Sequence, residues 1–136
     1  MKTAIWLRIA AVTSLVFAAG HTLGARKSWS PMGETDVLRA MRTVGFETTG
    51  VSRTYLDFFL GFGFSLAVYL VLQAFVLWQL ATLVSKGSTH LRPMIGAFAL
   101  ASLANAILAW VFILPVAAMF GGAVTVCLTC AFFVAR

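Results

Sequence analysis

The sequence predicts an all-α protein, a four-transmembrane-helix antiparallel bundle with a short amphipathic helix in the loop between the first two spans. Of its 136 residues, 61% are hydrophobic and 10% are charged, whereas a soluble domain is nearer half apolar and a quarter charged. A spanning helix needs about 20 mostly apolar residues, because hydrocarbon cannot satisfy a free peptide group. Four runs of suitable length take up most of the chain: 4–23, 55–84, 93–113 and 116–135. We therefore expect a single membrane domain over residues 1–136.

The first run, 4–23, resembles a cleaved secretory signal peptide as well as a membrane helix. It begins MKTAIWLR, and the apolar stretch 9–20 has the length of a signal peptide's central region. Apolar character continues through Leu23, however, and three further spans would pack better with a fourth. We interpret the run as an uncleaved helix. Small and polar residues at helical spacing indicate the face that packs against other helices: Ala11, Ser14, Ala18 and His21.

The segment 24–54 is the only part outside the four runs that is long enough to have structure of its own. Trp29 is expected to anchor at the membrane interface, and Pro31 with Gly33 indicates a turn. Apolar and charged residues then follow a helical pattern over 34–44. This pattern predicts a short amphipathic helix that lies on the bilayer or caps the bundle.

The last three runs carry small or polar residues at four-residue intervals. Asp57, Gly61 and Ser65 form such a line near the start of the second run. The third and fourth runs are joined only by a tight turn at 114–115, so they must be antiparallel neighbours. We expect their small-residue faces to meet; these are Ala97, Ala101, Asn105 and Ala109 on one side and Ala117, Gly121, Thr125 and Thr129 on the other.

The net charge of +6 comes from cations that flank the apolar runs. Such cations are typical of contacts with anionic lipid head groups, so the bilayer is the expected partner and nucleic acid is not. The positive-inside rule is undecided, because each side of a four-span topology carries five Lys or Arg: Lys2, Arg8, Lys86, Arg92 and Arg136 against Arg26, Lys27, Arg39, Arg42 and Arg53. All four acids lie on the loop side, and the cations of the other side lie in short segments. We therefore expect cytoplasmic termini and an external 24–54.

Ionisable residues inside membranes are costly and are functional candidates by default. His21 lies about 5 Å from the outer end of its helix, and Asp57 enters the second helix at a similar depth. Arg53 is one turn before Asp57, and Asn105 lies about 12 Å below the end of the third helix. These residues could join the first two helices, with Asp57 paired to Arg53 and His21. They could instead bind the polar head of a lipid-like ligand, or act as a proton relay or in catalysis.

The motif CLTC supplies a second candidate site. Cys127 and Cys130 would share a helix face and could exchange with a disulfide. The spacing in the last helix of a small bundle resembles the quinone-linked vitamin K epoxide reductase family, whose second, loop-borne cysteine pair has no counterpart here. Burial as small packing residues is the interpretation we favour. No metal site is predicted, since His21 and His90 lie in separate regions, and no cofactor is expected.

GHTLG at 20–24 together with YLDFFLGFG at 55–63 resembles an uncharacterised group of small bacterial four-helix integral membrane proteins. The resemblance implies a bacterial inner-membrane location and carries no activity. The layout is more distantly similar to DoxX-like proteins and to the sterol isomerase and sigma-2 receptor superfamily, which implies sterol-like ligands held by acidic residues, here Asp57.

We therefore expect a non-enzymatic membrane protein. It would bind a lipid, quinone or sterol-like ligand, a membrane partner or a second copy of itself near His21, Arg53, Asp57 and Asn105. The alternatives are a membrane thiol oxidoreductase that uses Cys127 and Cys130, and a purely structural subunit of a membrane assembly.

Overall fold

A computed structural model describes residues 2–25 and 30–135 of the chain. Trp29 and three cations of the orientation count, Arg26, Lys27 and Arg136, lie outside the described residues. The described part is 80% helical and holds five helices, of which four are long and apolar enough to cross a membrane. The all-α class predicted from the sequence is confirmed.

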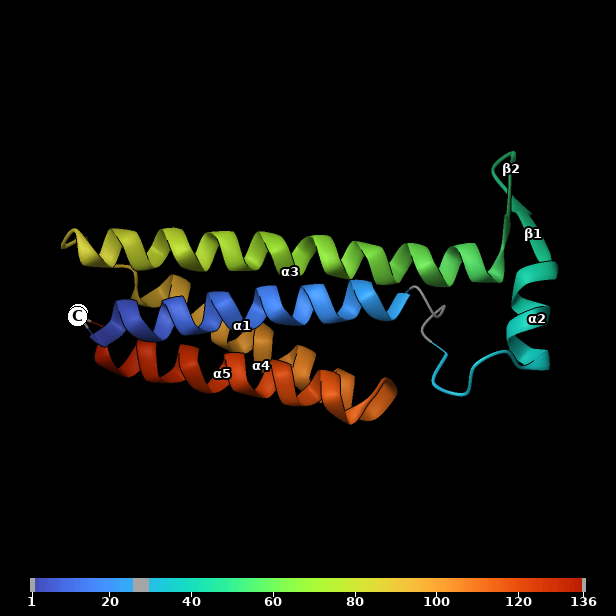
Figure 1. Ribbon diagram of the computed structural model, residues 1–136. Coiled ribbons are helices and arrows are strands. Elements are labelled where there is room, and N and C mark those ends of the chain that lie inside the picture. Colours follow the sequence, from blue (N-terminus) through green and yellow to red (C-terminus); the bar gives the residue numbers. More distant parts are fainter. Residues whose placement is uncertain (1, 26–29, 136) are drawn as a thin grey trace. The chain divides into compact units, whose positions relative to one another are not determined.

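The elements follow one another along the chain as drawn in Figure 1. They are α1 (Lys2–Ala25), α2 (Asp36–Thr43), β1 (Gly45–Thr48), β2 (Val51–Thr54), α3 (Tyr55–Ser85), α4 (Arg92–Phe112) and α5 (Pro115–Val134). Each long helix begins and ends within two residues of the limits expected from hydropathy. The amphipathic helix α2 begins two residues later than expected, because the Thr35 hydroxyl accepts a hydrogen bond from the Leu38 N–H at 3.2 Å and caps it.

The β-hairpin was not predicted from the sequence. Residues 45–54 were expected only to lead into the second span, but Gly45 pairs with Thr54 and Thr48 with Val51 in an antiparallel ladder. Thr49 and Gly50 connect the strands with φ angles of 50° and 77°. A two-residue hairpin turn of this kind requires positive φ at both positions, so threonine in the first of them masked the signal.

The chain divides into two compact units, and α1 and α3 contribute to both. The four-helix unit comprises residues 1–17 and 70–136, and the hairpin unit comprises residues 18–69. The four-helix unit contains the core. Its buried side chains come from α1, α3, α4 and α5: Ala4, Leu7, Ala10, Ala11, Leu77, Leu80, Ala81, Ile95, Val124, Cys127, Leu128 and Ala131. Helix α1 supplies four of these.

A hydrogen bond between α1 and α3 crosses the four-helix unit. Ser14 is fully buried; its hydroxyl donates to the Ala10 carbonyl at 2.9 Å and accepts from Gln73 Nε2 at 3.0 Å. The small and polar face expected for α1 is confirmed here, since Ala11 and Ala18 are also buried. Hydrogen bonds between membrane helices contribute about 0.6 kcal/mol on average, so this one aligns two helices more than it stabilises them.

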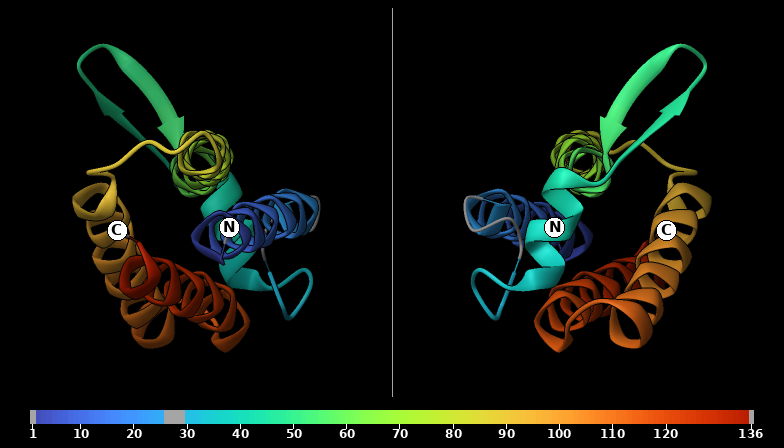
Figure 2. Two further views of the ribbon diagram at one scale, coloured as in Figure 1. Left: turned by 90° about the vertical axis from the view of Figure 1, so that its left-hand side faces the viewer. Right: turned by 90° about the vertical axis from the view of Figure 1, so that its right-hand side faces the viewer.

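Helices α4 and α5 lie side by side as an antiparallel pair, as Figure 2 shows. The small-residue face expected on α4 is only partly right. Ala97, Ala101 and Asn105 are exposed, whereas Ser102 and Ala109 are buried. The α4 face that meets α5 is turned by one residue, because Gly121 packs directly on Ala106, where an added Cβ would lie 3.1 Å from the Ala106 Cβ.

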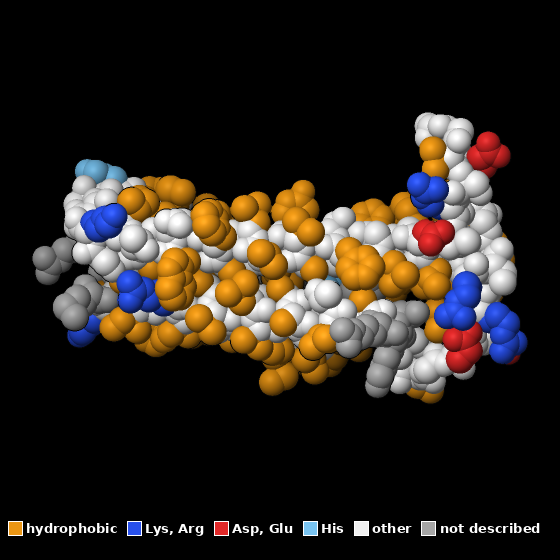
Figure 3. All heavy atoms as spheres, turned by 45° about the horizontal axis from the view of Figure 1, so that its top comes forward, with side chains coloured by type: hydrophobic (Ala, Val, Ile, Leu, Met, Phe, Trp, Pro, Cys, Tyr) orange, Lys and Arg blue, Asp and Glu red, His pale blue; other side chains and the backbone are white. Residues whose placement is uncertain are grey.

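Charged and apolar side chains occupy different parts of the hairpin unit. Figure 3 shows the charged side chains gathered over α2 and the hairpin, with apolar side chains on the adjoining turns of α3. On α2, Arg39 pairs with Asp36 at 3.1 Å. This division matches a segment at a membrane surface, with polar groups in water and an apolar helix below.

Candidate functional site

Asp57 takes part in the N-terminal cap of α3 and does not form the expected ion pair. Its Oδ2 accepts hydrogen bonds from the Thr54 N–H at 2.9 Å and from the Thr54 hydroxyl at 2.8 Å. The Thr54 Oγ1 in turn accepts from the Asp57 N–H at 3.1 Å. This reciprocal pattern is a capping box, with aspartate in place of the usual glutamate.

The prediction that Asp57 forms a salt bridge with Arg53 is therefore wrong. Within residues 2–25 and 30–135 the ion pairs are Arg39–Asp36 and Arg42–Glu34. Arg53 lies in β2, and its Nη1 donates to the Ser52 carbonyl at 2.8 Å. The capping box draws the carboxylate back toward Thr54, which is why helical spacing alone misplaced it.

His21 binds α3 at a different level from Asp57. Its Nε2 donates to the Gly63 carbonyl at 3.0 Å. Gly63 is six residues after Asp57 in α3, about 9 Å further along the helix axis. The expectation that the imidazole and the carboxylate meet at one depth was therefore wrong. His21 joins α1 to the backbone of α3.

Asn105 belongs to a different compact unit from the other predicted site residues. It belongs to the four-helix unit, whereas His21, Arg53 and Asp57 belong to the hairpin unit. It is exposed on α4. An exposed amide on a membrane helix is typical of a contact with another helix or a head group.

Arg53 and Asp57 line one cavity of about 300 Å³ on the surface of α3. Its other lining residues are Phe58, Gly61, Phe62 and Ser65. The line predicted through Asp57, Gly61 and Ser65 is thus confirmed as one helix face. A Cβ added at Gly61 would meet nothing within 4 Å, so the missing side chain leaves the floor of the cavity open.

Aromatic rings form the apolar wall of this cavity and hold the hairpin against α3. Phe58 and Phe62 make an edge-to-face contact with centroids 4.8 Å apart. Phe46 of β1 packs on Phe58 at 5.8 Å and on Tyr55 at 5.2 Å. Arg53 is the cross-strand partner of Phe46, so this packing places the guanidinium beside the first turn of α3. The sequence reasoning missed Phe58 and Phe62, although their spacing of four residues beside a glycine was a signal.

The cavity combines one cation, one carboxylate and one hydroxyl with an apolar wall. Both hydrogen bonds from Thr54 to the Asp57 carboxylate use Oδ2, so neither occupies Oδ1. Polar and apolar groups thus border the same cavity.

The cysteine pair lies in α5 within the four-helix unit. Both thiols are free; Cys127 is 8% exposed and belongs to the core, while Cys130 is half-buried. Thiol–disulfide exchange needs access to the attacked or attacking sulfur. The burial of Cys127 favours a packing role for this pair. Among the described residues, no three of His, Cys, Asp and Glu come together as a metal site would need.

The cavity on α3, with Arg53 and Asp57 at its polar edge and Phe58 and Phe62 beside Gly61, thus brings together two of the four predicted site residues. His21 supports the helix that carries it. Comparison of the chain with known protein families, with curated proteins and with solved structures finds no match.

Proposed function

We propose that the protein is a non-enzymatic integral membrane protein that binds a lipid-like molecule in the α3 cavity. The observation that carries the proposal is the pairing of Arg53 and Asp57 with an open, phenylalanine-walled space at Gly61. Amphipathic ligands need such a division between polar and apolar contacts.

The charges at the polar edge favour a zwitterionic head group. Arg53 offers guanidinium N–H groups to a phosphate, and Asp57 offers Oδ1 to an ammonium. The acyl chain would then lie over Phe58, Gly61 and Phe62 along the membrane-facing side of α3. Quinone and sterol head groups carry no charges to match either residue, so a phosphoethanolamine-type head fits the cavity better.

The test is native mass spectrometry of the protein in detergent with equal phosphatidylethanolamine and phosphatidylcholine. We expect preferential retention of phosphatidylethanolamine, because the choline head has no N–H to donate to Asp57. Arg53→Gln should weaken retention of both lipids about fivefold, since one arginine near a lipid phosphate contributes about 1 kcal/mol. Asp57→Asn should remove the preference while keeping an oxygen for the cap.

Glycine substitutions provide the matched control. Gly61→Phe fills the cavity and should abolish specific retention. Gly122→Phe, at a glycine of α5 that also has nothing within 4 Å of an added Cβ, should leave it unchanged. Equal retention in wild type, Gly61→Phe and Asp57→Asn would contradict the proposal. Co-purification of a different ligand or of a second subunit, insensitive to these changes, would replace it with a partner-binding role.

The location and orientation are part of the proposal. The protein would lie in the bacterial inner membrane with cytoplasmic termini and an external 24–54 segment, as a member of the four-helix group that shares GHTLG and YLDFFLGFG. Support comes from His21 and Gly63, one from each stretch, which meet in a hydrogen bond. We expect a reporter that functions only in the cytoplasm to be active after residue 136 and inactive when inserted at Gly50. The reverse pattern would invert the topology.

A further inference from the structure

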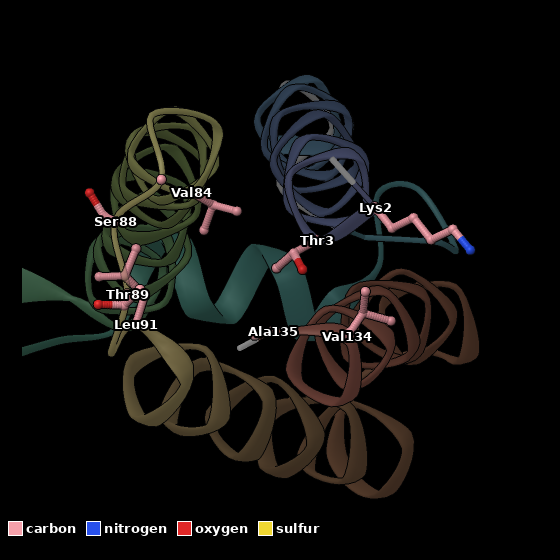
Figure 4. A pocket seen from close by; sticks show the side chains of 9 residues that line it. Lys2, Thr3, Val84, Ser88, Thr89, Leu91, Val134 and Ala135 are labelled. Carbon is pink, nitrogen blue, oxygen red and sulfur yellow. The ribbon is translucent and has the colours of Figure 1, made fainter.

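The four-helix unit has a cavity of about 450 Å³, and none of its lining residues belongs to the α3 cavity. It opens where α1 begins, α3 ends and α5 ends, and Figure 4 looks into it. We propose that this cavity is a binding site for a phosphate group, with the head group of an anionic phospholipid as its source.

Thr3 is the residue that points to a ligand. It is 5% exposed, and its hydroxyl is directed into the cavity in Figure 4. It has no hydrogen-bond partner within residues 2–25 and 30–135. The hydroxyl borders the cavity and is not sealed in the core, since Ser102 Oγ is the one sealed side-chain polar atom without a partner among residues 2–25 and 30–135. A phosphate oxygen in the cavity would accept from it.

The start of α1 adds donors and a favourable dipole at the same place. The first four N–H groups of a helix have no intrahelical acceptor, and the N-terminal end carries partial positive charge. No acidic residue lies in the first turn of α1 to occupy that position. Phosphate groups bind helix N-termini for these reasons, and the Thr3 hydroxyl lies within this turn.

The charge balance of the four-helix unit also favours an anion. Its described cations are Lys2, Arg8, Lys86 and Arg92, whereas the chain's four acids, Glu34, Asp36, Glu47 and Asp57, all belong to the hairpin unit. Lys2 borders the cavity, and its side chain extends away from it in Figure 4. Basic side chains at a membrane surface attract anionic lipids in this way.

The end of α3 shapes the opposite wall. Gly87 has a φ of 86°, the Gly87 N–H donates to the Val84 carbonyl and the Ser88 N–H donates to the Leu83 carbonyl. These bonds form a Schellman motif, which turns the chain so that Ser88 and Thr89 border the cavity. Val84 and Val134 supply apolar lining, which suits the glycerol and acyl portion of a lipid.

The experiment measures retention of phosphatidylglycerol by the full chain in phosphatidylcholine nanodiscs, with Thr3→Val as the main variant. Wild type should retain phosphatidylglycerol, and Thr3→Val should retain it about tenfold less, the worth of one hydrogen bond to a charged group. Without anionic lipid, Thr3→Val should be as stable as wild type or more so, because the hydroxyl it removes has no partner. Thr125→Val, which loses a hydrogen bond to Gly121 elsewhere in the unit, is the matched control and should bind normally.

Inorganic phosphate distinguishes the two sources of the same chemistry. If millimolar phosphate stabilises the wild-type protein against unfolding in pure phosphatidylcholine, and Thr3→Val loses this stabilisation, the site binds free phosphate. If only phosphatidylglycerol is retained and stabilises the protein, the site binds a lipid head group. Val84→Phe, which fills the cavity, should abolish either. Equal retention of both probes by wild type and Thr3→Val overturns the proposal, whether or not Val84→Phe folds. Gly122→Phe, at a residue that lines neither cavity, should leave phosphatidylglycerol retention unchanged.

Discussion

Gly121→Leu is expected to destabilise the protein by about 3 kcal/mol, the upper part of the range for overpacking a close contact. A Cβ at this position would lie 3.1 Å from the Ala106 Cβ, 3.2 Å from its Cα and 3.4 Å from its N. Two of these three atoms are backbone, which cannot rotate out of the way. The helices α4 and α5 would have to separate, and the packing that joins membrane helices depends on close approach.

The adjacent glycine provides the control for this prediction. Gly122 lies one position further along α5 and has nothing within 4 Å of an added Cβ, so Gly122→Leu should be neutral or slightly stabilising through helix propensity. Thermal unfolding in detergent, followed by circular dichroism, measures both. Equal midpoints for the two variants would show that α4 and α5 do not meet at Gly121.

Leu128→Ala should cost about 2 kcal/mol, the lower end of the range for emptying a buried leucine site. Leu128 is fully buried within the core that joins the helices of the four-helix unit. In a membrane the transfer of the side chain from water contributes little, because lipid tails are as apolar as leucine. The lost contacts around the residual cavity remain and set the magnitude.

Leu100→Ala makes the same chemical change at a site that is 70% exposed on α4. It should change stability by less than about 0.5 kcal/mol, as surface substitutions do. Unfolding in mixed micelles at increasing denaturing detergent compares the two variants under identical conditions. If Leu100→Ala proved the more damaging, α4 would be packed on a partner through its outer face.

The two candidate sites differ in the charges of the residues around them. In the hairpin unit a cation and a carboxylate share a cavity with phenylalanine rings, which suits a zwitterionic amphiphile. In the four-helix unit the Thr3 hydroxyl and the start of α1 border a cavity, and the described residues of that unit include no acid, which suits an anionic head group. On the two proposals, the protein would discriminate among lipids by head-group charge.

Some residues of the candidate sites could be identified from the sequence alone, and others could not. Asp57 was identified because an acid in an apolar run is costly, and Gly61 and Ser65 followed from helical spacing. The partner of Asp57 could not be identified in this way, since the capping box requires that the first residue of α3 be known exactly. Thr3 carried no signal, because a threonine near a helix start is ordinary until its burial and its missing partner are known.

The sequence by itself determined the four apolar helices, their limits and their order, because hydrocarbon-length runs and their punctuation are local properties of the chain. The tertiary structure alone decided that His21 bonds Gly63 instead of approaching Asp57, that Ala106 meets Gly121, and that the Thr49–Gly50 turn forms a hairpin. Those outcomes depend on the rotation and axial offset of one helix against another. A shift of one residue turns a helix face by about 100°, so the pairing of faces is settled only when the side chains pack.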